Sequence, residues 1–211
     1  MAATDKLIAG YQRFREGYYQ LHKKQLLQLA EQGQSPKIAI VSCSDSRVDP
    51  TIILDCAPGD LFVIRNVANL VPPLESCDSF HGTSAALEFA VNELQVESII
   101  ILGHTQCGGI KALMDTEPTE VPKTFISKWM KQLENVRKEI LEDQNCTSKE
   151  QHYHLCEQKG IVQSLANLMT FPCIQKRVAE GSLKLHGWCY DLNSAELFAL
   201  QQENGDFKKI S

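Results

Sequence analysis

Short apolar runs of strand length alternate with helical patterns along the first half of this 211-residue chain. The runs KIAIVSC (37–43), LFVIRNV (61–67) and VESIIILGH (96–104) are rich in β-branched residues, which is typical of buried strands. Between the last two runs, TSAALEFAVNEL (83–94) has apolar residues at helical spacing, with Thr83 or Ser84 as the expected N-cap. This alternation predicts an α/β fold with a mostly parallel β-sheet core flanked by helices.

The rest of the chain predicts helices around this core. Residues 5–32 place apolar side chains every three or four positions, so one helix is expected to end near Gly33. Residues 122–180 look mostly helical, LKLHGWCYDL (183–192) returns to a strand, and AELFAL (195–200) is a candidate hairpin arm. We expect one domain over residues 1–211, with an N-terminal helical arm (1–34), a core (35–192) with helical decoration toward the C-terminus, and a C-terminal extension (193–211).

Charge and composition argue against several classes of protein. The formal net charge is -5 and the pI is near 5.7, so a nucleic-acid partner is not expected. No stretch approaches the roughly 20 apolar residues of a membrane span, and the first residues lack a secretory pattern. We therefore expect no membrane partner and a cytoplasmic protein. In that reducing compartment the eight cysteines are expected to be free thiols or metal ligands.

Three residues with metal-binding side chains stand where two predicted strands end. Cys43 ends the first strand, and His104 and Cys107 follow the strand at 98–103. If the two strands are neighbours in a parallel sheet, these side chains converge outside its carboxyl edge. Two cysteines and a histidine are zinc ligands that leave a fourth position open. The spacing alone also fits two buried structural thiols and a histidine that caps a helix.

Asp45 and Arg47 follow Cys43 on alternate positions. In an extended segment this spacing puts both side chains on one face, where an arginine and a carboxylate form a bidentate pair. A phosphatase loop of the C-x5-R type is excluded, because the position that needs arginine holds Asp49. Gly108 and Gly109 begin the next helix, so their N–H groups favour an anion.

Several segments together resemble the β-class carbonic anhydrases. They are CSDSRVDP (43–50), PGDLFVIRNVANLVPP (58–73), HGTSAALEFAV (81–91), GHTQCGGIKALM (103–114) and HGWCYDL (186–192). The resemblance runs from about residue 33 to 192. It implies one Zn²⁺ per chain held by Cys43, His104 and Cys107. It also implies reversible hydration of CO2 to bicarbonate and a proton by a zinc-bound hydroxide, which the Asp45–Arg47 pair orients.

The resemblance further assigns a substrate site to five positions. Phe62, Val67 and Phe89 are implied to line an apolar pocket for CO2. The backbone N–H of Gly108 is implied to hold a substrate oxygen. Gln34, in GQSPK, is implied to reach bicarbonate in the site of a neighbouring subunit.

The same resemblance implies an assembly and an open metal site. The family's N-terminal helix wraps a partner subunit, which implies a homodimer or homotetramer. Relatives that close the site with the aspartate carry Trp and Gly where this chain has Ile40 and Ser42. We therefore expect the open, plant-like type. Two alternatives stay open at this point: a zinc-dependent hydrolase of CS2 or COS on the same fold, and a zinc-stabilised structural or interaction protein without turnover.

Overall fold

A single sheet runs through the centre of the computed structural model, which describes residues 2–75, 80–116 and 124–210. Within these residues its strands are β1 (Ile38–Cys43), β2 (Leu61–Asn66), β3 (Ser98–His104), β4 (Lys184–Tyr190), β5 (Leu197–Leu200) and β6 (Phe207–Lys209). The spatial order is β2-β1-β3-β4-β5-β6. The first four strands pair in parallel and the last two in antiparallel fashion. The expected α/β class is therefore confirmed, and the candidate hairpin arm is β5.

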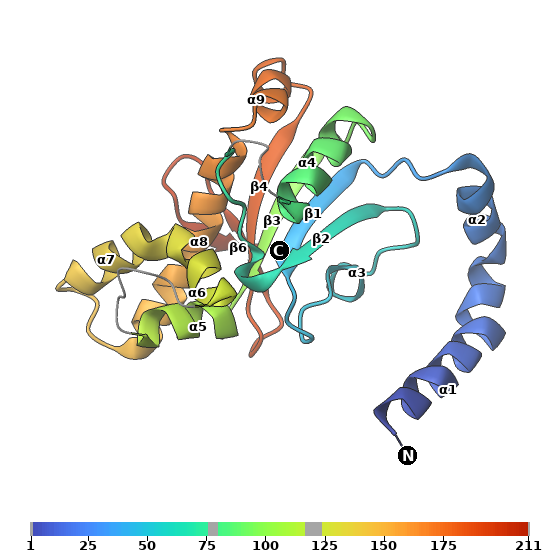
Figure 1. Cartoon of the computed structure of the whole chain (residues 1–211), viewed down its shortest axis with the longest axis horizontal. Coiled ribbons are helices and arrows are strands. Elements are labelled where there is room, and N and C mark those ends of the chain that lie inside the picture. Colours follow the sequence, from blue (N-terminus) through green and yellow to red (C-terminus); the bar gives the residue numbers. More distant parts are fainter. Residues whose placement is uncertain (1, 76–79, 117–123, 211) are drawn as a thin grey trace.

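Helices precede the sheet, connect its strands and cover it (Figure 1). They are α1 (Ala3–Glu16), α2 (Tyr18–Gln32), α3 (Pro50–Ile53), α4 (Gly82–Asn92), α5 (Gly108–Asp115), α6 (Phe125–Met130), α7 (Glu134–Glu142), α8 (Lys149–Leu168) and α9 (Pro172–Ala179), with 3₁₀ turns η1 (Val67–Asn69) and η2 (Lys131–Leu133). In the described part of the chain, no helix is long and apolar enough to cross a membrane.

The main core lies between one face of the sheet and helices α4, α8 and α9. Ile161 of α8 is fully buried there and packs between two strand glycines. A Cβ built on Gly103 would lie 2.6 Å from Ile161 Cδ1, and one built on Gly187 would lie 2.9 Å from its Cγ2. The two glycines therefore let α8 approach the strands more closely than any larger residue would allow.

A second core cluster lies beyond the carboxyl end of the strands, where α5 to α8 pack together. Leu133 and Cys156 are fully buried within it, and Cys43 and Cys107 belong to the same cluster. Helices thus enclose this edge of the sheet.

The N-terminal arm consists of two helices that project away from the sheet (Figure 1). The expectation of one helix over residues 5–32 is wrong, because the chain turns at Gly17, where φ is -106° and ψ is -88°. Glycine is a poor helix former, so the break falls on one of the two residues of this segment that favour the helix least, although the helix passes through the other, Gly10. Neither α1 nor α2 buries a residue. Leu29 meets the core at Gly59, and Gln25 Nε2 donates to the Pro58 carbonyl at 2.8 Å.

The expected cap of α4 is also corrected. The helix begins at Gly82, and His81 rather than Thr83 or Ser84 is its N-cap. The Thr83 hydroxyl instead accepts a hydrogen bond from Asn66 Nδ2 at 3.2 Å. A contact with the neighbouring strand has replaced the local cap, which sequence alone does not reveal.

Candidate metal centre

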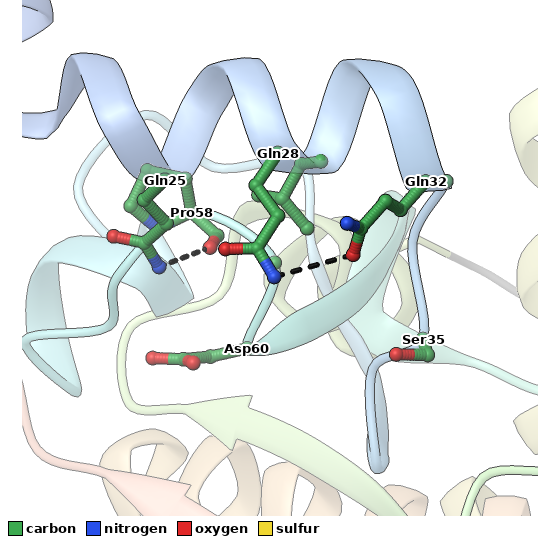
Figure 2. Close-up of a pocket in the computed structure, with 9 residues that line it drawn as sticks. Gln25, Gln28, Gln32, Ser35, Pro58 and Asp60 are labelled. Carbon is green, nitrogen blue, oxygen red and sulfur yellow. Dashed lines mark hydrogen bonds between the residues drawn. The ribbon is translucent and has the colours of Figure 1, made fainter.

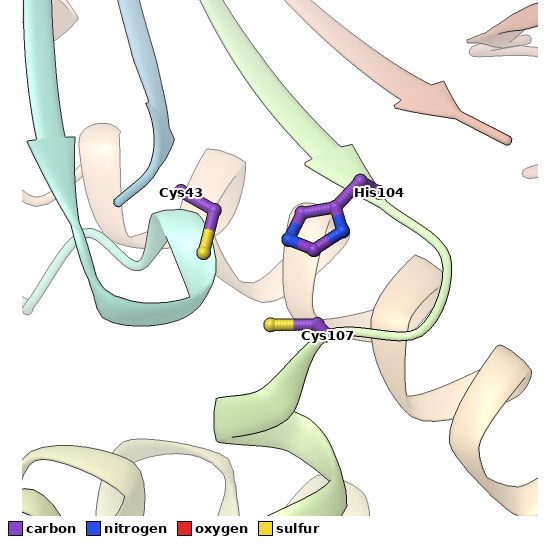
Figure 3. A group of neighbouring side chains, drawn as sticks. All are labelled: Cys43, His104 and Cys107. Carbon is purple, nitrogen blue, oxygen red and sulfur yellow. The ribbon is translucent and has the colours of Figure 1, made fainter. Parts of the chain in front are cut away.

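The ends of β1 and β3 bring two cysteines and a histidine together (Figure 3). Cys43 is the last residue of β1, His104 is the last residue of β3, and Cys107 is the N-cap of α5. One possible ligand atom from each residue lies within 4.8 Å of the other two, and all three residues are buried. Because β1 and β3 are parallel neighbours, their carboxyl ends meet at the same edge of the sheet.

The histidine ring presents one nitrogen to this group. His104 Nδ1 lies 2.8 Å from the Thr105 carbonyl oxygen, which fixes the ring. His104 Nε2 is buried without a hydrogen-bond partner among the described residues. A buried polar atom without a partner is costly, and a metal ion would satisfy it. A metal-binding histidine commonly donates its other ring N–H to a carbonyl in this way.

The two thiols cannot both ionise without a nearby cation. A hydrogen bond from Cys107 lowers the pKa of Cys43, against the opposing effect of burial. The same hydrogen bond, together with burial, raises the pKa of Cys107 far above its usual value. Burial would lower the pKa of His104, but the neighbouring Cys43 thiolate raises that pKa overall. A divalent cation would remove the repulsion between two thiolates, and this donor set suits zinc.

Asp45 and Arg47 form the expected bidentate pair beside the thiols. Arg47 Nε donates to Asp45 Oδ1 at 3.0 Å, and Arg47 Nη2 donates to Asp45 Oδ2 at 2.7 Å. Hydrogen bonds from Arg47 hold the pKa of Asp45 well below its usual range, so Asp45 is ionised near neutral pH. Arg47 Nη2 also donates to the Gln106 carbonyl at 3.1 Å, which ties the loop after Cys43 to the loop before Cys107.

Comparison with known proteins gives the family. The family model for carbonic anhydrase matches residues 38–197. The chain is 37% identical to a carbonic anhydrase of Synechocystis sp. over 202 residues, which cover 96% of this chain and 73% of that protein. This chain belongs to the β-class carbonic anhydrases. It is also 43% identical to the chloroplastic β carbonic anhydrase 5 of Arabidopsis thaliana over 161 residues, or 75% of this chain and 52% of that protein.

Solved carbonic anhydrase structures have the same fold. The β-carbonic anhydrase CcaA superposes with a TM-score of 0.89 at 36% identity, over 99% of this chain and 92% of that one. A tetrameric β-carbonic anhydrase of the fungus Sordaria macrospora gives a TM-score of 0.74 at 30% identity, over 98% of this chain and 95% of that one. Carbonic anhydrases of this class use zinc, and the Cys43–His104–Cys107 group fits that ion.

Two of the expected carbonic anhydrase substrate residues lie at the same edge of the sheet as the thiols. Gly108 is the first residue of α5, next to Cys107, and a Cβ built on it would meet nothing within 4 Å. Val67 follows β2, and its Cγ1 would lie 2.8 Å from a Cβ built on Gly109. Val67 is 37% exposed, so an apolar surface and a backbone N–H lie close to the metal-binding group.

The other three expected substrate residues lie toward the opposite edge. Phe62 is paired with Ala39, whereas Asn66 is paired with Cys43. Ala39 lies four residues before Cys43 on β1, so Phe62 is about 13 Å from Cys43 along the strand direction. Phe89 contacts Phe62, with ring centroids 5.9 Å apart. Gln34 is exposed and precedes the first residue of β1. The structure therefore does not bring Gln34, Phe62 and Phe89 to the metal-binding group of their own chain.

Glu157 is a neighbour of the site that the sequence reasoning did not identify. Its side chain, on α8, is only 3% exposed, and its Oε1 accepts a hydrogen bond from the Cys107 N–H at 2.9 Å. Burial raises the pKa of Glu157 to about 7. The detectable signal was a charged residue on the apolar side of a helix, four positions before the buried Ile161.

A separate polar cavity of about 390 Å³ lies between α2 and the segment before β2 (Figure 2). Gln28 Nε2 donates to Gln32 Oε1 at 3.2 Å along its wall. Asp60 contributes a carboxylate, but its Oδ2 already accepts from the Ala57 N–H at 2.8 Å. Its lining residues do not include the metal-binding group, although Gly33 and Ser35, on either side of the expected site residue Gln34, belong to the lining.

Proposed function

We propose that this chain catalyses the reversible hydration of CO2 to bicarbonate and a proton, with Cys43, His104 and Cys107 as the zinc ligands. The observation that carries the proposal is the buried group of two sulfurs and one ring nitrogen within 4.8 Å of one another. Its unpartnered His104 Nε2 supports a metal ion there, and membership of the family supplies the reaction. One zinc per chain is expected.

The Asp45–Arg47 pair is proposed to orient the attacking water. Zinc, when bound, lowers the pKa of a coordinated water toward about 7 and so supplies a nucleophile near neutral pH. Asp45 is held ionised by Arg47, so its carboxylate only accepts hydrogen bonds. Asp45 therefore accepts a hydrogen bond from the attacking oxygen and leaves the lone pair of that oxygen directed at CO2.

Gly108 and Val67 are proposed to hold the substrate at this edge of the sheet. The Gly108 N–H opens helix α5, where the helix dipole favours the negative charge that develops on the substrate oxygens. Val67 offers an apolar surface to CO2 and is fixed by a hydrogen bond from Trp129 Nε1 to its carbonyl oxygen at 2.8 Å. Both groups contribute without moving a proton.

We propose that the working form is a homo-oligomer, either a dimer or a tetramer. The arm supports this, because Leu7 and Leu21 are 72% and 84% exposed and neither arm helix buries a residue. Gln34, Phe62 and Phe89 lie too far from the metal-binding group of their own chain, so we propose that they complete the CO2 and bicarbonate site of a neighbouring copy. The tetrameric relative from Sordaria macrospora agrees with such an assembly.

The domain organisation and the compartment are also proposals. We propose one domain over residues 1–211, with the arm at 1–34, the core at 35–192 and the extension at 193–211. The continuous pairing of β4 with β5 and of β5 with β6 supports it, since the extension adds to the sheet of the core. We propose a cytoplasmic enzyme. The cysteines in the described part of the chain are free thiols, which supports a reducing compartment.

The decisive test measures zinc content and CO2 hydration on the purified protein, alongside Cys107→Ala. We expect one zinc per chain and hydration activity in the natural sequence, with both strongly reduced in the variant. Full zinc and full activity in Cys107→Ala would refute the ligand assignment. Assaying CS2 and COS hydrolysis on the same sample tests the alternative substrates, and a zinc-loaded protein without turnover would support a structural role.

A further inference from the structure

The loop between β1 and α3 is held by an arginine from the neighbouring strand. Arg65 Nε donates to the Cys43 carbonyl at 2.9 Å, and its Nη2 donates to the Asp45 carbonyl at 2.7 Å and the Val48 carbonyl at 3.3 Å. Its Nη1 donates to Asp49 Oδ2 at 3.2 Å. One guanidinium thus binds both the last residue of β1 and the loop that carries Asp45 and Arg47.

Four electronegative oxygens converge on this guanidinium. One is the carbonyl oxygen of Cys43 at the end of β1 and two are loop carbonyl oxygens. The fourth belongs to the carboxylate of Asp49, which also caps α3 by accepting from the Thr51 N–H. Oxygens that point to one place repel each other unless a donor lies between them. The planar fork of arginine has five N–H groups and can serve several such acceptors at fixed angles, which a lysine cannot do.

The local contacts of the loop do not replace this arginine. Asp45 also interacts within the loop, because its carbonyl accepts from the Val48 N–H at 3.2 Å and its Oδ1 accepts from the Arg47 N–H at 2.9 Å. These bonds shape the turn. Further bonds tie it to its surroundings at Ser44, whose N–H donates to the Asn66 carbonyl at 2.8 Å, and at Arg47, which binds the Gln106 carbonyl. Arg65 ties it at Asp45, Val48 and Asp49. Cys43 is paired with Asn66 in the ladder to β2, and the preceding Ser42 is paired on both sides of β1, so a shift of the loop would move Asp45 more than the thiol.

We propose that Arg65 is a positioning residue that sets the orientation of the Asp45–Arg47 pair relative to the metal-binding group. This inference rests on the proposed function, since the pair acts on the attacking water there. This role of Arg65 involves no contact with the substrate. Arg65 acts through the backbone of the loop, and its loss misaligns the Asp45 carboxylate while the three ligands stay in place.

The test compares Arg65→Ala, Arg65→Lys and a matched control. Arg177 provides the control, because its guanidinium also binds backbone carbonyls, those of Val91 and Ser182, away from the site. In Arg65→Ala we expect kcat to fall about 10–100-fold, as is typical when a support of a metal site is removed, with KM little changed. Arg65→Lys should lose somewhat less, and Arg177→Ala should keep kcat even where it lowers the melting temperature.

Three readouts separate positioning from a general loss of stability. Guanidinium ion at concentrations far below those that unfold the protein should restore part of the activity of Arg65→Ala, whereas sodium chloride at equal ionic strength should not. Zinc content under competition with a chelator should stay near one per chain. A crystal structure of Arg65→Ala should show residues 44–49 displaced.

The outcomes distinguish the inference from the proposed function. A natural sequence that neither holds zinc nor hydrates CO2 would overturn the proposed function and this inference with it. An active natural sequence with unchanged kcat in Arg65→Ala would overturn only the role of Arg65. Equal losses of kcat in Arg65→Ala and Arg177→Ala, without rescue by guanidinium, would also overturn the role of Arg65, because the lower kcat would then follow from lower stability alone.

Discussion

Gly103→Ala measures how closely α8 packs on the strand that ends at His104. The new Cβ would lie 2.6 Å from Ile161 Cδ1 and 2.8 Å from its Cγ1, well inside the roughly 3.5–4.0 Å of an ordinary carbon contact. Ile161 cannot turn away easily, because its Cγ2 packs against Gly187, where a Cβ would already lie only 2.9 Å from it. Overpacking of this kind costs about 1–3 kcal/mol. At about 2–4 °C per kcal/mol for a chain of this size, the melting temperature should fall by about 2–12 °C.

A double-mutant cycle gives the sharper test. Ile161→Ala alone should cost about 2–5 kcal/mol, because it empties a buried site. It also removes both Ile161 atoms that the new methyl group of Gly103→Ala meets. The double variant should therefore be about 1–3 kcal/mol more stable than the sum of the two changes predicts.

The assay is denaturant unfolding of zinc-loaded protein at one fixed concentration, followed by circular dichroism. Gly82→Ala serves as the control, because a Cβ there would meet nothing within 4 Å, and it should change stability by less than about 0.5 kcal/mol. Strict additivity of the Gly103 and Ile161 changes, or full stability in Gly103→Ala, would refute the close-packing argument.

Three further measurements test other parts of the structure. Asp45→Asn should keep zinc and lose about 10–100-fold in hydration rate, and an unchanged rate would rule out the orienting role. Burial raises the pKa of Cys156 and of Cys189 to about 12, so both thiols stay protonated at pH 8. Iodoacetamide at that pH should therefore label the partly exposed thiols first. Early labelling of either buried thiol in folded protein would contradict this. Burial and Lys184 lower the pKa of His186, which favours the neutral ring in the fold, so folding stability should be lost as the pH falls and His186 becomes protonated. The ring centroid of Trp188 lies 6.5 Å from that of His186, so the fluorescence of Trp188 should report this titration in a variant without the other tryptophan. The midpoint should lie below pH 6.5, and a midpoint at or above pH 6.5 would contradict the lowered pKa of His186.

The strands and the metal-binding group were predictable because few signals decide them. A short, continuous apolar run such as 96–104 is typical of a strand buried on both faces of a parallel sheet. The carboxyl ends of parallel strands lie at the same edge of the sheet, however far apart the strands are in the sequence. Cys43 and His104 thus meet for reasons of topology. The Asp45–Arg47 pair was predictable for a different reason, because both partners lie within three residues.

Contacts between distant segments were not predictable from a single sequence. Arg65 lies 22 residues from the carbonyl of Cys43 that it binds, and Glu157 lies 50 residues from the N–H of Cys107. Neither contact has a local pattern. The break at Gly17 was missed for the opposite reason, because the apolar spacing continues across it and outweighed the low helix propensity of one glycine.

The position of the metal-binding group along the chain has a consequence for synthesis. Cys43, His104 and Cys107 are all present once residue 107 has been made, together with strands β1 to β3 that carry or flank them. Helix α8 begins only at Lys149 and strand β4 at Lys184. A chain still on the ribosome therefore holds the full ligand set before the segments that later pack around it have been made.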